Sequence, residues 1–542
     1  MTVTFNPPGP GQWALDQSHY PSGVTPLSQS LLKRGLYDGI ERVFKELGMP
    51  ATSIAIEFVN GFAYSRLQPL IGANSKPRKP PPDFVLKAVT RLHPEFRERN
   101  KRATATLRDS PSNAVVHRWE HELRPQLVSK NKAFQGFDPH AATDDDLQQH
   151  ITNLVHALHE SFELHFWLHG HDLGPIARYL HTALSWDLSA GDAVAALAGA
   201  SPSTGRPIGM LCELRAMVEA SPSVINDLED VRALSPDAQA LLDTYLGERG
   251  CILATGYDLD DATLGELPSV VLTSIKTATA PPAPNHDEVA AGLRAQIPNT
   301  EHAKFDQLLA DARNVMDMRD DNGPLTIEWP MGLLRRALLA AGERLHERNK
   351  LDHVEHILEV DEDEVHRLFT GSTSQASFST TLADRAAHRA KLAKLEPPAV
   401  LGPDEPEPPL DALPSALGEL VSMTNTAMQY MGMTPREESF TGVGIGTDSY
   451  IGIARVADSA SDAIHRLEPG QVLVVRATSP AFNVVLGIAG AVVTADGGAL
   501  SHAAVLSREL GIPAVIGAGD ALSIPDGATI EVDPKAGTVR VL

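Results

Sequence analysis

Apolar residues recur at three- and four-residue spacing through most of the first 395 residues, which is the period of an amphipathic helix. The clearest stretches are residues 154–168, 237–246, 286–296, 301–318, 331–348 and 382–395. From residue 442 the pattern changes to short β-rich runs separated by glycines, with strands predicted at 471–476, 490–494, 514–516 and 529–533 and helices at 481–488 and 502–510. The pattern therefore predicts a multidomain chain, with a mainly α-helical N-terminal domain and a small C-terminal α/β domain.

Between these two parts, residues 396–411 are crowded with prolines and carboxylates and have no amphipathic period. This composition is typical of a semi-rigid, extended linker. A helix is predicted directly after it, at residues 412–430. We therefore divide the chain into a helical domain (1–395), a linker (396–411), a connecting helix and hinge (412–440) and an α/β domain (441–542).

The charge balance limits the classes of partner. Lys and Arg number 46 against 69 Asp and Glu, a formal net charge of −23 over 542 residues. A field of that sign repels phosphate backbones and anionic lipid surfaces, so neither a nucleic acid nor a membrane is an expected partner. The two cysteines fit a reducing compartment, and the N-terminus lacks the basic and apolar regions of a secretion signal, so a cytoplasmic location is expected.

The segment from Thr494 to Ile516 carries the most informative chemistry. It reads as a strand, a turn containing Gly497 and Gly498, a helix that begins with His502, and a second strand. Ser501 is a suitable N-cap, which places the imidazole over the unpaired amides of the first helical turn. The helix dipole disfavours an imidazolium there and favours an arriving anion. His502 is therefore predicted to be neutral and nucleophilic.

This segment resembles the phosphohistidine domain of the phosphoenolpyruvate-utilising enzymes, and the resemblance covers about residues 441–542. It implies a swivelling carrier domain in which His502 is the residue that becomes phosphorylated. Thr494 would hydrogen-bond the ring or the phosphoryl group. The predicted phosphoryl-binding loop consists of Gly497, Gly498 and Ser501.

Three motifs before the linker are similar to the helical substrate-binding domain of the rifampin phosphotransferases, a branch of the same family. They are residues 13–19 with Thr25 and Pro26, residues 256–260, and Met318-Arg319 followed by residues 334–339. The resemblance implies that Arg319 lies near the transferred phosphoryl group, where one guanidinium can bind phosphate oxygens bidentately. The lysine that often follows four residues later in the family is Gly323 here. A solvated position at a helix end is the alternative for Arg319.

Histidines and aromatic residues are dense between residues 156 and 171. His165 and His169, one helical turn apart, could share a face and bind a metal ion. No third ligand is evident, so we predict no metal site and prefer a helix that lines an acceptor pocket, with plain helix packing as the alternative. The predicted pocket residues are His165, Phe166, Trp167 and His169, with Trp13 and His19 closing the pocket.

The resemblance implies one subunit of a split ATP-dependent dikinase, a phosphotransferase that works through a phosphohistidine intermediate and releases AMP and phosphate. ATP and Mg²⁺ would be bound mainly by a separate ATP-grasp subunit, since the chain has no GxxxxGK[ST] loop. The expected acceptor is a small-molecule hydroxyl, first a phenol such as a hydroxyacetophenone and second an antibiotic. A non-enzymatic phosphocarrier or regulatory subunit is the alternative from another class.

Overall fold

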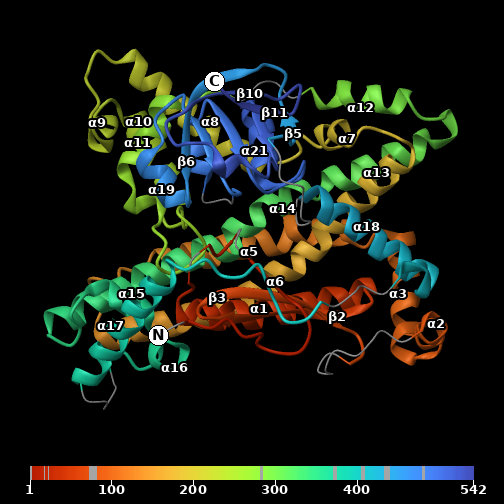
Figure 1. Cartoon of the computed structure of the whole chain (residues 1–542). Coiled ribbons are helices and arrows are strands. Elements are labelled where there is room, and N and C mark those ends of the chain that lie inside the picture. Colours follow the sequence, from red (N-terminus) through yellow and green to blue (C-terminus); the bar gives the residue numbers. More distant parts are fainter. Residues whose placement is uncertain are drawn as a thin grey trace. The chain divides into compact units, whose positions relative to one another are not determined.

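The described part of the chain is mainly helical and contains one sheet of four strands and one of seven (Figure 1). The computed structural model describes residues 3–16, 19–21, 23–72, 82–280, 285–369, 375–404, 409–431, 440–478 and 482–542. Contacts divide the chain into two compact units. The first comprises residues 1–171, 257–260 and 322–422, and the second comprises residues 172–256, 261–321 and 423–542.

The first unit combines the four-stranded sheet with helices. Its strands are β1 (Trp13–Leu15), β2 (Ala51–Val59), β3 (Phe62–Pro69) and β4 (Val400–Leu401). Its helices are α1 (Pro26–Leu47), α2 (Asp83–Leu92), α3 (Pro94–Asp109), α4 (Ser112–Arg118), α5 (Arg124–Gln135), α15 (Trp329–Glu347), α16 (Glu362–Val365) and α17 (Gln375–Leu392). Three further helices contribute residues to both units, namely α6 (Asp144–Ser185), α14 (Met316–Gly323) and α18 (Ser415–Met431).

The second unit combines a helical part with the seven-stranded sheet. Its other helices are α7 (Ala190–Ala195), α8 (Pro202–Ala220), α9 (Leu228–Arg232), α10 (Pro236–Arg249), α11 (Pro268–Thr277), α12 (His286–Ala295), α13 (His302–Asn314), α19 (Ala460–Arg466), α20 (Asn483–Leu486) and α21 (His502–Leu510). Its strands are β5 (Val443–Ile445), β6 (Tyr450–Ala457), β7 (Val472–Val475), β8 (Ala491–Thr494), β9 (Ala514–Ile516), β10 (Thr529–Asp533) and β11 (Thr538–Val541). None of the described helices is long and apolar enough to cross a membrane.

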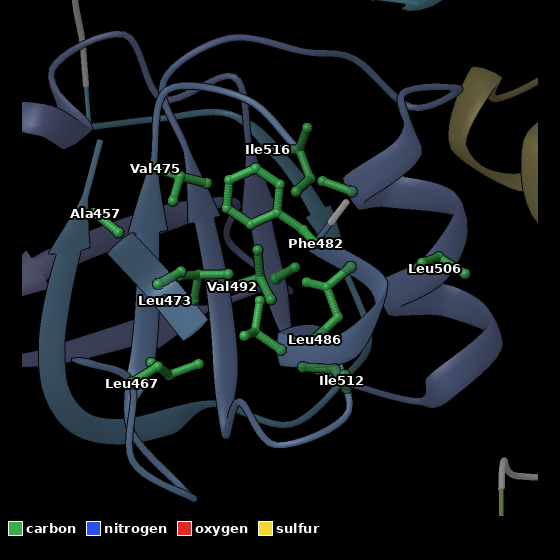
Figure 2. Close-up of a cluster of buried hydrophobic side chains, with 14 of the residues drawn as sticks. Ala457, Leu467, Leu473, Val475, Phe482, Leu486, Val492, Leu506, Ile512 and Ile516 are labelled. Carbon is green, nitrogen blue, oxygen red and sulfur yellow. The ribbon is translucent and has the colours of Figure 1, made fainter. Parts of the chain in front are cut away.

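The seven-stranded sheet confirms the predicted C-terminal sheet domain. Its order is β11-β10-β6-β7-β8-β9-β5, and the four strands from β6 to β9 are parallel. Val472–Val475 and Ala491–Thr494 are buried at every position, which explains their uninterrupted apolar sequence. Figure 2 shows the core on one face of this sheet, where side chains of the strands meet Phe482, Leu486 and Leu506 from the helical side.

The four-stranded sheet was not expected from the hydrophobic pattern. Its order is β2-β3-β1-β4 and all its pairs are antiparallel. Asn60 and Gly61 join β2 to β3 with φ angles of 52° and 79°. Two successive residues at positive φ make the tight hairpin turn for which Asn-Gly is preferred. This dipeptide was the available sequence signal for the hairpin.

The first part of the predicted linker forms a strand of the four-stranded sheet. Val400 and Leu401 pair with Ala14 and Trp13 as the edge strand β4. This edge position suits a proline-rich segment. Proline has no backbone N–H, so it cannot make all the hydrogen bonds that a strand inside a sheet requires. Residues 405–408 and most of the predicted hinge, residues 432–439, lie outside the described residues. The domain boundaries drawn from the sequence stay a prediction.

The far end of the same segment is also held within the first unit. Lys87 Nζ lies 2.7 Å from a carboxylate oxygen of Asp411, and the Thr90 hydroxyl donates to the Ala412 carbonyl at 2.6 Å. Both cross-links come from α2. The proline-rich segment is therefore anchored to one unit on both sides.

Helices α1 and α6 pack through glycines. A Cβ atom at Gly35 would collide with Phe162, and one at Gly39 would collide with the Glu163 carbonyl oxygen. The two backbones can approach this closely only because no side chain stands at these positions. The contact fixes the stretch of α6 that follows Phe162, where the predicted pocket residues lie.

Replacing Gly35 by alanine is expected to lower the midpoint of thermal unfolding, because overpacking of this kind costs about 1–3 kcal/mol. Gly292→Ala in α12 is the matched control, since nothing lies within 4 Å of its Cβ position. Alanine favours a helix over glycine by about 1 kcal/mol, so the control should melt at the same or a higher temperature. Equal melting temperatures for wild type and Gly35→Ala would contradict the close α1–α6 contact.

Candidate functional site

His502 is the first residue of α21, directly after the turn that follows β8. Ser501 caps the helix as predicted, and its hydroxyl accepts a hydrogen bond from the Ala504 backbone N–H. Gly497 has a φ of 114°, and a Cβ there would lie 3.1 Å from both Ile516 and the Ser501 hydroxyl. The turn thus requires glycine at this position and leaves the approach to the helix start clear of a side chain.

Thr494 stabilises this turn through two hydrogen bonds of its hydroxyl. Its side chain is fully buried, and its hydroxyl donates to the Asp496 carbonyl at 2.7 Å and accepts from the Gly517 N–H at 3.2 Å. A hydrogen bond to the His502 ring involves Thr478, whose Oγ1 lies 2.9 Å from Nδ1. The predicted contact of Thr494 with the ring or the phosphoryl group stays a prediction.

The ring of His502 is in the charge state that a nucleophile requires. Burial lowers its pKa to about 3, so the imidazole is neutral at pH 7. A neutral ring carries one N–H. When Nδ1 holds that proton and donates it to Thr478, Nε2 keeps the lone pair needed for attack on phosphorus.

Arg319 lies on α14, in the same compact unit as His502. Its Nη1 is 3.3 Å from Oδ1 of Asp172, a carboxylate that is 1% exposed. The guanidinium itself keeps 18% of its side-chain exposure. A buried carboxylate therefore orients Arg319, and its contact with a phosphoryl group stays a prediction.

Parts of the three N-terminal motifs meet within the first unit, whereas Met318 and Arg319 of the third motif belong to the second unit. The Thr25 N–H and hydroxyl donate to the two carboxylate oxygens of Asp258, at 2.7 and 2.5 Å. The Arg335 guanidinium, from the third motif, donates to the Leu259 carbonyl at 2.9 Å. Segments far apart along the chain are thus joined at one loop, and the role of this loop in an acceptor site stays a prediction.

His165 lies next to another predicted pocket residue, His169. Its ring centroid is 4.5 Å from that of His169, and its Nδ1 is 2.9 Å from the Thr326 hydroxyl. Burial and the neighbouring His169 ring hold the pKa of His165 well below its ordinary value, and His19 acts in the same direction. The His19 ring is 5.7 Å from that of Tyr257, in the second motif.

Phe166 and the two predicted tryptophans have different surroundings. Phe166 contacts the His165 ring edge-on, with centroids 4.9 Å apart. Trp167 instead donates from Nε1 to Glu46 at 2.7 Å, on the α1 side, because residues two apart on a helix point in different directions. Trp13 lies in the core of the four-stranded sheet. The ring contacts bring His165, Phe166 and His169 together, and the acceptor pocket itself stays a prediction.

Two threonines of these sites were missed in the sequence. Thr478 follows β7 and His502 follows β8, and these strands are parallel neighbours, so their carboxyl ends share one edge of the sheet. Ligands gather at that edge in such sheets, so the position was a usable signal. Thr326 lies in a π-helical turn, η4 (Pro324–Glu328), for which the sequence gives no comparable signal.

Two other histidines of α6 lie at a different place. His156 and His159 line a cavity of about 460 Å³, and His159 is held by Glu362 at 2.7 Å. Within the described ranges, no group of three His, Cys, Asp or Glu side chains is placed to hold a metal ion.

The mixed sheet thus carries a histidine at a capped helix start, directly after a glycine turn. Residues 467–537 match the family described as PEP-utilising enzyme, mobile domain. The resemblance to the phosphoenolpyruvate-utilising enzymes is thereby confirmed for this part of the chain.

Among similar proteins, chondramide synthase of Chondromyces crocatus is 27% identical over 98% of this chain, which spans 14% of that protein. Rifampicin phosphotransferase of Bacillus cereus is 28% identical over 39% of this chain and 22% of its own length. Phosphoenolpyruvate synthase of Aeropyrum pernix is 43% identical over 16% of this chain and 11% of its own length. The chain thus matches less than a quarter of each of these relatives.

The His502 ring is expected to stay neutral at pH 5, because its pKa is about 3. Histidine-selective ¹⁵N NMR, assigned with a His502→Ala spectrum, would show a neutral ring at pH 5 whose nitrogen shifts Thr478→Val changes more than Thr478→Ser. The unfolded chain takes up this proton near pH 6.5 and the folded chain does not, so the stability contributed by the neutral ring is lost as pH falls below that value. A titration midpoint near 6.5 in the folded protein would contradict the site.

Proposed function

We propose that this chain accepts a phosphoryl group on His502 and transfers it to the hydroxyl of a small aromatic molecule. The observation that carries the proposal is the His502 ring at a capped helix start, neutral and hydrogen-bonded through Nδ1 to Thr478. An imidazole in that state can attack phosphorus through Nε2. The amides of the first helical turn of α21 then stabilise the phosphoryl oxygens.

The acceptor site of this proposal is in the first unit, around His165. The rings of Phe166, His169 and Tyr257 supply flat apolar surface, and the histidines supply polar atoms. Such a lining suits a phenol, for example a hydroxyacetophenone. A larger antibiotic hydroxyl is the second candidate, favoured by the similarity to a protein named rifampicin phosphotransferase.

The phosphoryl donor in this proposal is ATP with Mg²⁺, held mainly by a separate ATP-grasp subunit. The overall reaction is ATP, acceptor and water to AMP, phosphate and phosphorylated acceptor, as in a dikinase. The carrier domain swivels so that His502 meets donor and acceptor in turn, and Arg319 neutralises charge on the phosphoryl oxygens. The reaction takes place in the cytoplasm.

The test is to incubate the chain with labelled ATP, Mg²⁺, a candidate ATP-grasp subunit and a panel of phenols. Wild type should form phosphohistidine, AMP and a phosphorylated phenol, and the chain without its partner should not turn over ATP. His502→Ala should form none of these products, since alanine offers no nucleophile. His465→Ala is the matched control, because His465 is an exposed histidine in the same domain.

Phosphohistidine without any phosphorylated acceptor would indicate the alternative, a phosphocarrier or regulatory subunit. Label incorporation by His502→Ala at the wild-type level would overturn the assignment of His502 itself.

A further inference from the structure

The hydrogen bonds around Thr326 determine which nitrogen of His165 carries its proton. A threonine hydroxyl has a single hydrogen. Thr326 donates it to the backbone carbonyl oxygen of Asn322 at 2.5 Å. The side-chain oxygen of Asn322 lies farther away, at 3.0 Å. The hydroxyl can then only accept from His165, whose Nδ1 lies 2.9 Å away. Nδ1 therefore carries the hydrogen, and the lone pair of the neutral ring is on Nε2.

The surrounding backbone holds this arrangement in place. Asn322 is fully buried, and its Nδ2 donates to the His165 carbonyl oxygen at 3.1 Å. Thr326 is also fully buried and belongs to the π-helical turn η4, which interrupts the helical stretch between α14 and α15. Single π-helical turns occur frequently at functional sites. Here the turn brings a buried hydroxyl to the edge of a histidine ring.

We propose that His165 is the general base that removes the proton from the acceptor hydroxyl, acting through Nε2, with Thr326 as the residue that positions it. This inference rests on the proposed function and assigns the proton transfer that the function leaves open. It follows from the geometry of the Asn322–Thr326–His165 chain.

Transfer from His502 to the acceptor moves one proton and one phosphoryl group. The acceptor O–H bond breaks as its proton passes to Nε2 of His165, while the oxygen forms a bond to phosphorus. The bond between phosphorus and Nε2 of His502 breaks, and its electron pair returns to that nitrogen, which leaves as a neutral imidazole. His165 then releases its proton to solvent, so no further co-reactant is needed.

His19 is a poorer candidate for this role. Both oxygens of Asp16 lie 3.0 Å from its Nδ1. The Asp16 carboxylate raises the pKa of His19, which favours the charged ring. A protonated His19 is suited to stabilising negative charge and not to accepting a proton.

The experiment starts from wild-type and variant chains phosphorylated on His502 by the ATP-grasp partner, and follows one turnover onto phenol and onto 4-nitrophenol at pH 8. His165→Gln should leave formation of phosphohistidine unchanged and slow transfer to phenol by about 10²- to 10⁴-fold, the usual contribution of a general base. The loss should be under about 10-fold for 4-nitrophenol, which is already largely ionised and needs no base. A misfolded or misplaced site would slow both acceptors equally.

Thr326→Val should slow transfer to phenol by about 10-fold, while Thr326→Ser, which keeps the hydroxyl, should retain the wild-type rate. His156→Gln is the control on the same helix, since His156 lies outside the site. If wild type and His165→Gln transferred to phenol at equal rates, or if His165→Gln lost the same factor with both acceptors, His165 would not be the base. The proposed function would still stand. Stable phosphohistidine in wild type that no phenol discharges would overturn the proposed function, and the base with it.

Discussion

A buried, neutral imidazole beside a threonine hydroxyl is the feature on which both proposed chemical steps depend. In each site a threonine hydroxyl lies 2.9 Å from Nδ1, Thr478 at His502 and Thr326 at His165. In each site burial is the main reason that the ring stays neutral. A carboxylate in the same place would raise the pKa of the ring, as Asp16 does for His19. A hydroxyl orients the ring without adding charge, so the ring can stay neutral.

The sheet domain could be predicted from the sequence because its inner strands are buried on both faces and read as continuous apolar runs. The N-terminal sheet could not, because residues of β2 and β3 are buried only in part and show no regular alternation. Its Asn60-Gly61 turn was a local signal, but a short hairpin between long helical stretches is easily overlooked. The pairing of β4 with β1 joins residues almost 400 positions apart, and no local pattern specifies such a contact.

The candidate site likewise contains residues that the sequence could predict and residues that only the folded chain brings together. Ser501 and His502 are adjacent, so capping logic places them correctly from the sequence. Thr478 and Thr326 lie 24 and 161 residues from the histidines that they contact, and only the folded chain brings them there. Trp167 was grouped with His165 by proximity in sequence, although helix geometry turns it toward Glu46.

The anchoring of the proline-rich segment changes what that segment can do. Its two attachment points, at Leu401 and at Asp411, both lie on the first unit. The free energy of closing a flexible loop rises by only about 0.6 kcal/mol for each doubling of its length. A flexible affinity tag inserted between these two points is therefore expected to lower the stability of the first unit only slightly.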